Sequence, residues 1–518
     1  MRRKFRLTFY YSDMPLTNNV MIVRHKLLTN LIKLWKDNQL VERIDRLPIE
    51  LSPRTSRVLG RCCVHKERAV WKYKSFPLMG FDMSDETDEL TPLSEYARKA
   101  LERKGQQQKD NILCVIDEAC SSCVQTNYEI TNLCKGCVAR ACATNCPKNA
   151  ISFVNGKAFI DQDLCIKCGR CVTTCPYNAI VKVERPCAKA CGVGAIRSDE
   201  HGRADIDYNK CVSCGMCLVN CPFGAIVDKG QIFQLIQSIK RGDEVIAIVA
   251  PAFVNQFPNM TPAKLREAMK RLGFANTAEV AIGADLCTID EAHDFLEEVP
   301  SKHPFMGTSC CPAWSVMAKK NFPKFADCIS MAMTPMVLTA RLLKQDHPAA
   351  RICFVGPCAA KKLEASRHSV RSEVDFVLTF EELMGMFEAK QINFDDLPDD
   401  PNDNFNNASA DGRGFAVSGG VAQAVVNVIK KEDPTREVKV VSAQGLAECK
   451  KMMQLAAAGK YNGYLLEGMA CPGGCIAGAG TLADPARSAM MLNKYKAQAT
   501  MKTAADTPYK DTLDKLKY

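Results

Sequence analysis

The sequence has no apolar run approaching the roughly 20 residues that a membrane-spanning helix needs. Its opening stretch, "MRRKFRLTFYYSDM", is basic but lacks the continuous apolar segment and small-residue cleavage site of a secretory signal. No G-x-G-x-x-G motif for binding a dinucleotide is evident, so direct NAD chemistry would need another subunit. We therefore expect a cytoplasmic chain with no membrane span.

Features of nucleic-acid binding are also lacking, although the formal net charge is +10. Residues 1–113 contain 22 Lys and Arg against 14 Asp and Glu, so they carry +8 of that total, but no recognition-helix motif or aromatic-basic interleaving accompanies the charge. The formal charge also treats every cysteine as neutral, whereas thiolate-bound iron–sulfur clusters are negative. We expect no nucleic-acid partner.

Cysteine is abundant, with 28 residues. Most of these cysteines stand in tight C-x-x-C groups, where disulfide rings would be strained and metal ligation is the better interpretation. We therefore expect the thiols to be reduced or metal-bound.

Composition divides the chain into three parts. Residues 1–110 are basic and predicted to be mostly helical, 111–230 are rich in cysteine, and 231–518 alternate apolar runs with amphipathic segments, as α/β domains do. The polar stretch "ERKGQQQKDN" (102–111) reads as a linker.

The first part allows two interpretations. "NNVMIVRHKLLTNLIKLWKDNQL" predicts a helix with Leu27, Leu31 and Trp35 on one face. It could be a cap that packs on its neighbours, or a basic docking surface for an acidic electron carrier. Cys62 and Cys63 have no partner cysteine nearby, so we do not expect them to be ligands.

The cysteine-rich part is an internal repeat. "NCPKNAI" (145–151), "TCPYNAI" (174–180), "ACGVGAI" (190–196) and "NCPFGAI" (220–226) are four versions of one unit. "CIKCGRC" precedes the second unit and "CVSCGMC" the fourth, which completes the bacterial ferredoxin run whose last cysteine ligates the other cluster of a pair. Interleaved sets with Cys-Pro endings argue against zinc ribbons.

Sixteen cysteines between positions 120 and 221 are enough for four 4Fe-4S clusters. The swapping rule predicts four sets: Cys134, Cys137 and Cys142 with Cys175; Cys165, Cys168 and Cys171 with Cys146; Cys211, Cys214 and Cys217 with Cys191; and a split set of Cys120, Cys123 and Cys187 with Cys221. Cys114 is a competing ligand for the split set.

The third part combines buried strands with four further cysteines. "EVIAIVAPAF" (244–253), "ARICFVGPC" (350–358) and "GYLLEGMAC" (463–471) read as buried parallel strands, whose carboxyl ends commonly gather ligands. "TPAKLREAMKRLG" (261–273) reads as a capped helix. Cys311, Cys358, Cys471 and Cys475 could ligate one more cluster, assembled only by folding.

Three segments of this part resemble the signature motifs of the iron-only (FeFe) hydrogenases: "TSCCPAW", "GPCAAKKLEA" and "EGMACPGGCIAGAG", in order and at compatible separations. The resemblance extends from about residue 112 to the end, and the first part resembles extensions in the group B subfamily. It implies a multidomain α+β and α/β fold with a helical N-terminal region, a ferredoxin-like region with four 4Fe-4S clusters, and a C-terminal α/β H-cluster domain.

The same resemblance implies an H-cluster: a 4Fe-4S cubane on Cys311, Cys358, Cys471 and Cys475, bridged by Cys475 to a diiron subcluster with CO, cyanide and azadithiolate. Pro251, Ala252, Lys361 and Met469 would contact the diiron unit. Without the motif, Lys361 would read as a solvated lysine beside Lys362, and Met469 as core.

The resemblance implies different roles for the adjacent residues Cys310 and Cys311. Cys311 would bind the cubane, while Cys310 stays free to pass protons along a relay of Glu291, Ser330 and Asp294. A lone buried cysteine is normally inert, and carboxylates three residues apart are usually solvated. Gly356, Met336 and Ala252 depart from the family's usual residues, which bears on catalytic bias and oxygen tolerance but removes no ligand.

The implied activity is the reversible reaction of two protons and two electrons to dihydrogen. Its partners would be ferredoxin or a similar low-potential carrier and the hydrogenase maturation proteins. Two alternatives are a hydrogen or redox sensor of the same fold and a hydrogenase-like iron–sulfur assembly factor, which lacks the diiron centre. The factor should lack Cys310 or Lys361, and both are present.

Overall fold

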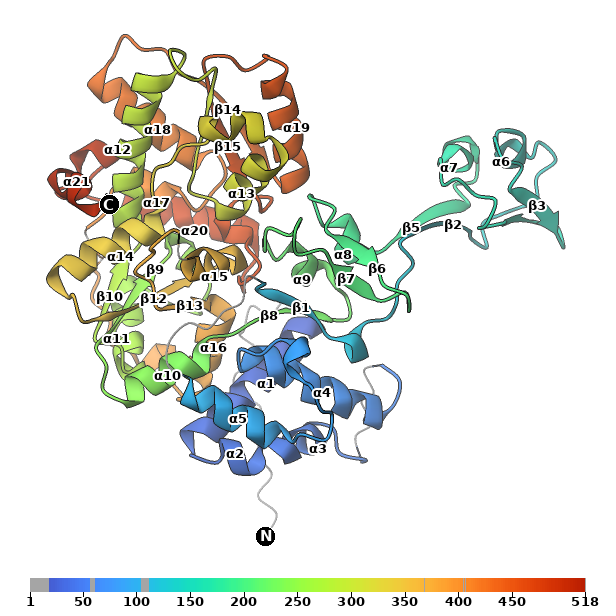
Figure 1. The fold of residues 1–518 in the computed structure, drawn as a ribbon, viewed down its shortest axis with the longest axis horizontal. Coiled ribbons are helices and arrows are strands. Elements are labelled where there is room, and N and C mark those ends of the chain that lie inside the picture. Colours follow the sequence, from blue (N-terminus) through green and yellow to red (C-terminus); the bar gives the residue numbers. More distant parts are fainter. Residues whose placement is uncertain are drawn as a thin grey trace.

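The computed structural model describes residues 18–55, 61–103, 111–367, 369–403, 405 and 407–517. Most of the predicted linker, residues 104–110, and the opening basic segment lie outside these ranges. Figure 1 shows a helical part, a cysteine-rich part from which a long projection extends, and a large α/β part. Within the described ranges, no helix is both long and apolar enough to cross a membrane.

The helical part packs against the α/β part. It contains α1 (Asn19–Lys36), α2 (Leu40–Arg43), α3 (Leu47–Leu51), α4 (Val64–Leu78) and α5 (Leu93–Glu102). The buried Leu27 and Leu31 lie on α1, which packs along α16 (Phe380–Ala389). Arg24 pairs with Glu381. This arrangement agrees with a cap that packs on its neighbours. At least one cation of the cap, Arg24, forms an ion pair with the α/β part.

The cysteine-rich part divides into two halves. The inner half contains β1 (Leu113–Val115) paired with β8 (Ile226–Asp228), β6 (Ile196–Ser198) paired with β7 (Ala204–Ile206), α8 (Pro186–Lys189) and α9 (Met216–Asn220). The outer half, residues 124–184, is called the arm here because it projects from the rest (Figure 1). It contains β2 (Thr126–Ile130) with β5 (Ile180–Glu184), β3 (Ile151–Val154) with β4 (Lys157–Ile160), α6 (Ala141–Thr144) and α7 (Arg170–Thr174).

Backbone geometry explains the four repeated units. The residue three places after each unit's cysteine has a positive φ, and the next residue, always alanine, donates its amide to the cysteine sulfur at 3.2–3.4 Å. Asn and Gly tolerate that conformation best, so the sequence repeats them there. The positive-φ residues are Asn149, Asn178, Gly194 and Gly224.

The C-x-x-C segments share a second backbone feature. In the first C-x-x-C of each of the four predicted sets, the residue before the second cysteine has a positive φ, at Ser122, Gly136, Lys167 and Ser213. The segment Cys120–Cys123 therefore has the same local conformation as the segments of the two full ferredoxin runs. This likeness favours the split set as a cluster site.

The α/β part contains two parallel sheets. One has the strand order β10 (Asn276–Glu279), β9 (Val245–Val249), β12 (Arg351–Gly356), β13 (Phe376–Thr379); the other has β11 (Met306–Gly307), β15 (Tyr464–Met469), β14 (Lys439–Gln444). All three predicted apolar strands are present. The sequence did not predict that the third would belong to a separate sheet, because apolar runs carry no information about which strands pair.

Helices cover both sheets. The predicted helix after β9 is α11 (Pro262–Leu272), capped by Thr261 and ended by Gly273 in a left-handed conformation. The others of this part are α10 (Ile232–Lys240), α12 (Ala281–Glu298), α13 (Pro312–Asn321), α14 (Pro335–Asp346), α15 (Ala359–Ser366), α16, α17 (Ala410–Gly414), α18 (Gly420–Glu432), α19 (Leu446–Ala457), α20 (Pro485–Ala497) and α21 (Leu513–Leu516).

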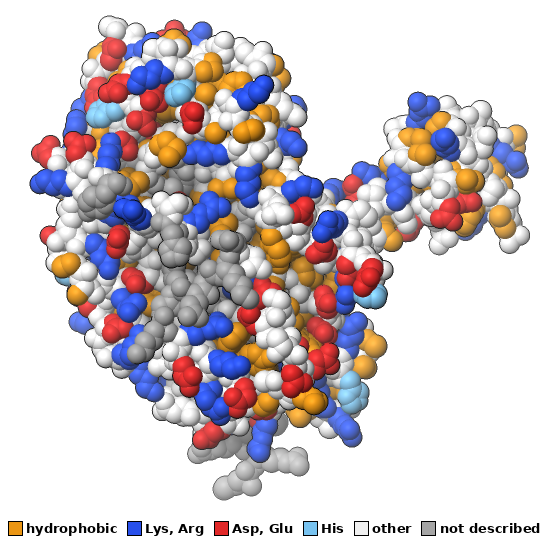
Figure 2. All heavy atoms as spheres, in the orientation of Figure 1, with side chains coloured by type: hydrophobic (Ala, Val, Ile, Leu, Met, Phe, Trp, Pro, Cys, Tyr) orange, Lys and Arg blue, Asp and Glu red, His pale blue; other side chains and the backbone are white. Residues whose placement is uncertain are grey.

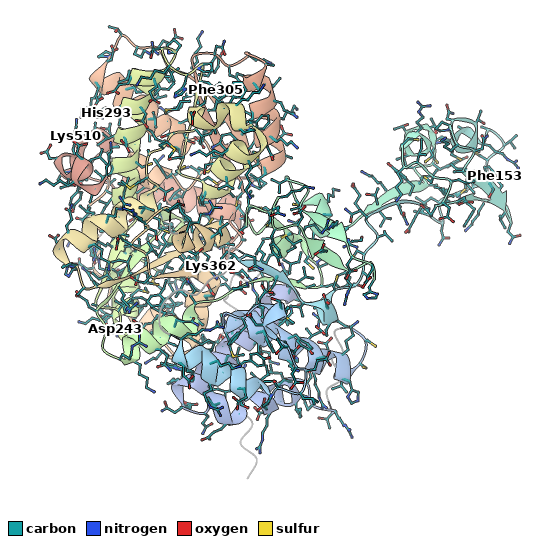
Figure 3. All side chains as sticks on the ribbon, viewed as in Figure 1. Phe153, Asp243, His293, Phe305, Lys362 and Lys510 are labelled. Carbon is teal, nitrogen blue, oxygen red and sulfur yellow. The ribbon has the colours of Figure 1, made fainter. Side chains whose placement is uncertain are left out.

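A buried lysine joins the three parts. Lys362 of α15 has 0% exposure, and its Nζ donates to Asp228 Oδ2 at 2.7 Å, the Lys229 carbonyl at 2.9 Å and Glu382 Oε1 at 3.0 Å. Arg24 lies 3.8 Å from the other oxygen of Asp228. Figure 3 labels Lys362 at this junction. Lys362 is therefore a structural residue, for which the sequence analysis made no prediction.

Candidate functional site

The carboxyl ends of strands from both sheets meet at one cavity of about 80 Å³, called the chamber here. Segments that follow β9, β11, β12 and β15 form its walls, as expected for ligand sites at strand carboxyl ends. The predicted site residues that line it are Pro251, Ala252, Cys310, Cys311, Cys358, Lys361, Met469 and Cys475.

Of the four predicted cluster ligands, Cys311, Cys358 and Cys475 line the chamber, and Cys471 lies close enough to all three for their charges to act on it. Cys311 and Cys358 are the N-caps of α13 and α15, so the positive ends of two helices face their sulfurs. Cys471 and Cys475 flank a turn in which Gly474 has φ +93°, and a side chain there would meet the Ser418 backbone N at 2.6 Å. Glycine is required at that position on both grounds.

The chemistry of this donor set fits an iron–sulfur core. Burial raises the pKa of all four thiols, to about 11 at Cys358, and neighbouring thiolates raise the pKa further at Cys358, Cys471 and Cys475. Four thiolates that destabilise one another gain stability from a cationic core between them, because a coordinating thiol is deprotonated by its metal.

Trp314 couples two of the motifs. Its ring packs on Gly468, where a side chain would come within 2.1 Å of the ring, and its Nε1 donates to the Thr308 carbonyl at 3.0 Å. The tryptophan of the first motif therefore packs tightly against the glycine of the third. This contact fixes the segments that carry Cys311 and Cys471 relative to each other.

Lys361 brings a positive charge to the chamber wall. Its Nζ donates to Glu364 Oε2 at 2.6 Å. Burial disfavours the ammonium, but Glu364 and the nearby thiolates of Cys358 and Cys310 hold the pKa of Lys361 above its usual value. Lys361 is therefore a charged donor in a site nearly closed to water, and Met469 lies buried beside it in the wall.

Cys310 lies beside a buried acid. Glu291 Oε1 accepts from the Ser309 amide at 2.6 Å and lies 3.0 Å from the Ser309 hydroxyl. Burial raises the pKa of Glu291 to about 8, and the charges of Asp294 and Asp290 add to the rise. Glu291 is thus a carboxyl that can hold and release a proton near neutral pH.

The outer end of the predicted relay lies on the same helix. Ser330 Oγ donates to Asp294 Oδ2 at 3.2 Å and accepts from the Ala332 amide at 3.0 Å. Between the two halves, Ser309 Oγ lies 2.8 Å from the Ala332 carbonyl. Glu291 Oε2 is buried and has no hydrogen-bond partner among the described residues. Glu291 and Ser330 are therefore not joined by a direct hydrogen bond through this oxygen.

One departure from the family pattern, Gly356, has a packing explanation. A side chain at Gly356 would lie 2.5 Å from the ring of Phe354, which itself lines the chamber. Phe354 therefore fills the space that a larger residue at position 356 would need. Met336 and Ala252 also line the chamber, and both are buried.

The split set surrounds a cavity of its own. Cys120, Cys123, Cys187 and Cys221 all line one small cavity of about 20 Å³. Cys114 does not line it, because its side chain packs on β1 against the helical part. Among the described residues, no three His, Cys, Asp or Glu side chains are placed to hold a single metal ion.

The other predicted sets are also brought together. Besides burial, Cys175 and Cys137 raise the pKa of Cys142, and Cys165 and Cys168 raise that of Cys171. In the inner half, burial raises the pKa of Cys214 to about 12, with contributions from Cys191, Cys211 and Cys311. Because the charge of Cys311 acts on the pKa of Cys214, the inner set must lie beside the chamber. The remaining predicted ligands of these sets are Cys134, Cys146 and Cys217.

Three residues of the site escaped the sequence interpretation. Glu364 accepts a hydrogen bond from Lys361, and Ser309 donates one to Glu291. The ring of Phe354 occupies the space that a side chain at position 356 would need. Glu364 had a signal, since it stands three residues after Lys361 on a predicted helix. Ser309 and Phe354 act through tertiary contacts that spacing does not encode.

Comparison with known proteins finds three family profiles in the chain. The iron only hydrogenase large subunit, C-terminal domain, matches residues 243–479, and 4Fe-4S binding domains match 158–181 and 203–226. The first of these ranges contains the chamber. The two short ranges contain the full ferredoxin runs.

Curated relatives fall into two classes. The periplasmic Fe hydrogenase large subunit of Nitratidesulfovibrio vulgaris is 28% identical over 44% of this chain and 64% of its own length, and iron hydrogenase 1 of Clostridium pasteurianum is 27% identical over 74% and 75%. The cytosolic Fe-S cluster assembly factor narfl of Danio rerio is 27% identical over 42% and 66%. The chain therefore matches less than two thirds of the length of the Nitratidesulfovibrio vulgaris protein. Together, the chamber, the ferredoxin runs and these matches show that the chain is an FeFe-hydrogenase-like protein with 4Fe-4S binding domains.

Proposed function

We propose that the protein catalyses the reversible conversion of protons and electrons to dihydrogen. The observation that carries this proposal is the chamber itself, where a free cysteine, a buried lysine and four cysteines from two sheets converge. Cys311, Cys358, Cys471 and Cys475 would hold an H-cluster. When bound, that group supplies the iron at which protons and electrons combine.

The chain's own residues would position the group and move protons. Lys361, held by Glu364, would donate a charged hydrogen bond to a cyanide of that group when it is bound. Cys310 is free of the cubane and carries a proton between the chamber and Glu291. From Glu291 the proton reaches Ser330 and Asp294, with one ordered water serving the unpartnered Glu291 Oε2.

Electrons would travel from the arm through the inner half to the chamber. A side chain at Gly215, in the inner set, would lie 2.5 Å from Ala479 Cβ and 3.3 Å from Ala359 Cβ, so the two sites touch. Ala359 follows the ligand Cys358 directly. Four accessory 4Fe-4S clusters, two of them in the arm, would form this path.

The carrier would dock on the arm. Cys168 is exposed there, and the arm also carries exposed apolar side chains and an excess of cations, with seven Lys and Arg against four Asp and Glu in residues 124–184 (Figure 2). A surface that combines exposed apolar side chains with cations fits an acidic carrier such as ferredoxin. The exposed large apolar residues are Val124, Leu133, Val138, Val154, Phe159, Leu164, Ile166, Tyr177 and Val181.

We favour this docking surface over the alternative on the basic N-terminal region. In the helical part, Arg24, Arg61 and Lys72 each pair with a carboxylate. The charge of that part therefore serves internal contacts to a large degree. The arm presents its cations to water together with the cluster ligands.

A second candidate function is iron–sulfur assembly without a diiron centre. It is favoured by the relative from Danio rerio, which matches this chain at the same identity as the hydrogenase from Clostridium pasteurianum. Cys310 and Lys361 have a role only in the hydrogenase. Their presence in the chamber wall makes the hydrogenase the better-supported candidate.

Hydrogen evolution distinguishes the two functions. The full chain is produced with and without hydrogenase maturation proteins, and hydrogen is measured with chemically reduced viologen as donor. We expect evolution only from the matured protein. No evolution from matured protein with a full complement of iron would contradict the proposal and favour the assembly factor.

A further inference from the structure

A buried cation of the helical part forms no ion pair in the described chain. Lys74 of α4 is 3% exposed, and it has neither a hydrogen bond nor an ion pair with any described residue. Its cationic neighbours differ, because Arg24 pairs with Glu381 and Arg61 with Glu67. The Lys74 side chain lines a cavity of about 600 Å³, so its ammonium lies in a recess of the protein and no described carboxylate neutralises its charge.

The Lys74 side chain reaches the turn that carries Cys221. A side chain at Gly224 would lie 3.0 Å from Lys74 Nζ, and Lys74 lines the same cavity as Cys221 and Pro222. Arg61 Nη2 donates to the Phe223 carbonyl at 3.0 Å on the same turn. Two cations of the helical part, Arg61 and Lys74, thus lie against the turn that carries Cys221, the last predicted ligand of the split set.

The repeat leaves room for this contact at Gly224, although glycine alone does not encode it, since a side chain at Gly194, the matching position of the third unit, would meet no atom within 4 Å. At the position of Gly224, the two units of the arm have Asn149 and Asn178, in nearly the same left-handed conformation. An asparagine at position 224 would collide with Val20, because its Cβ would lie only 2.6 Å from Val20 Cγ1, and it would also crowd Lys74. Glycine therefore clears the space through which the ammonium approaches Cys221.

Electrostatics identifies the missing counter-charge. Burial, then the charges of Arg61 and Arg24, lower the pKa of Lys74 to about 7, while the Cys221 thiolate and, to a smaller extent, Glu67 raise it. Glu67 is already paired with Arg61, whereas Cys221 lines both the Lys74 cavity and the cavity of the split set. The anion available to the ammonium is therefore the thiolate-bound cluster on the far side of this one cysteine.

We infer that Lys74 is a positioning residue for the split-set cluster, and that its ammonium raises the reduction potential of that cluster. Reduction adds one negative charge to the cluster, and a buried cation beside Cys221 stabilises the reduced form more than the oxidised form. In the arm, by contrast, the lysines are exposed and water screens them. The helical part would thus act on electron flow from inside the molecule.

The inference needs a 4Fe-4S cluster on the split set, which is part of the proposed function, but it does not need hydrogen chemistry. The test uses the full chain made without maturation proteins, so its failure and that of the hydrogenase proposal are separate. Potentiometric titration followed by electron paramagnetic resonance compares wild type with Lys74→Met, Lys74→Arg and Lys72→Met. Lys72 lies on the same helix and pairs with Glu86 near the surface.

We expect Lys74→Met to move one cluster transition to a more negative potential by a tenfold change in its reduction equilibrium, about 59 mV. Lys74→Arg and Lys72→Met should leave all transitions in place, and iron per chain should be unchanged. In a Cys221→Ser background, which removes the target, Lys74→Met should have no further effect.

Unchanged potentials in Lys74→Met with full iron would overturn the inference, as would a shift that persists in the Cys221→Ser background. If Lys74→Met does not fold, Lys74→Gln carries the same test, because its amide is neutral and of similar length. Loss of one cluster's iron in both variants would assign Lys74 to cluster retention and would also overturn the inference.

Discussion

The arm and the chamber use the same ligand in opposite surroundings. In the arm, Cys168 is exposed and short local runs of sequence supply the whole ligand set, whereas the chamber collects cysteines from strands of two buried sheets. Val138, next to a ligand of the arm, is 99% exposed. Exposed cluster sites can exchange electrons with another protein, while a closed site can control which protons enter.

The comparison predicts that a chamber cysteine and its neighbour have unlike roles. Cys310→Ser should lower hydrogen evolution by about two to four orders of magnitude, because a serine hydroxyl releases its proton far less readily than a thiol. Iron content should stay at the wild-type value. Cys311→Ser should instead lose iron, since it removes a ligand.

Activity assays and iron analysis of the two variants check this prediction. Near-normal turnover in Cys310→Ser would show that protons take another route. Full iron in Cys311→Ser would remove that cysteine from the ligand set.

Excising the arm should separate the two regions. Thr126 and Glu184 pair at its base, so a short turn can replace residues 127–183. Iron in protein made without maturation proteins should fall from about 20 to about 12 per chain, four for each lost cubane. Ferredoxin-driven evolution should fall at least tenfold, whereas viologen-driven evolution should persist, because viologen can reach the inner clusters.

Iron analysis and both donor assays measure this outcome. Equal loss of activity with both donors would mean that the arm is needed for more than electron entry. An unchanged ferredoxin rate would place the docking surface elsewhere.

Much of this comparison could be predicted from the sequence, and the reason is local. The arm's ligands stand within C-x-x-C-x-x-C runs, and even its positive-φ residues, such as Asn149 and Lys167, are fixed by position in the repeat. The capped helix at Thr261 was predicted for the same reason. Local spacing is what a sequence displays directly.

The missing elements depend on contacts between distant segments. Residue spacing does not predict the second sheet or the hydrogen bond from Ser309 to Glu291. It also does not predict the three hydrogen bonds that Lys362 donates. The family resemblance supplied the chamber residues, but it gave no account of Lys74. These contacts join parts separated by up to hundreds of residues, where hydrophobic pattern alone does not specify the partner.

Charge reversal on the arm tests its docking role more gently. Lys167→Glu should raise the KM for ferredoxin severalfold at low ionic strength and leave the viologen rate unchanged, because it acts on encounter with an acidic partner. The effect should shrink as salt increases. The matched control is Lys66→Glu, an exposed lysine of the helical part.

Steady-state kinetics at two salt concentrations give the result. A larger effect from Lys66→Glu than from Lys167→Glu would return the docking surface to the helical part.

The buried acid of the chamber predicts a pH effect on stability. Burial raises the folded-state pKa of Glu291 to about 8, above its unfolded value near 4.5, so its contribution is present at low pH and is lost as pH rises toward 8. Glu291→Gln lacks that ionisation. Its melting temperature relative to wild type should therefore rise by a few degrees between pH 5 and pH 8, as measured by circular dichroism. A constant difference over this range would mean that Glu291 is not held neutral.

Infrared spectroscopy of the matured protein tests the central claim, that the chamber holds a diiron site while the arm holds only cubanes. The account predicts sharp bands of metal-bound CO and cyanide in the full chain, the same bands after excision of the arm, and none in Cys475→Ser. Absence of the bands from matured full-length protein with complete cubanes would contradict the account.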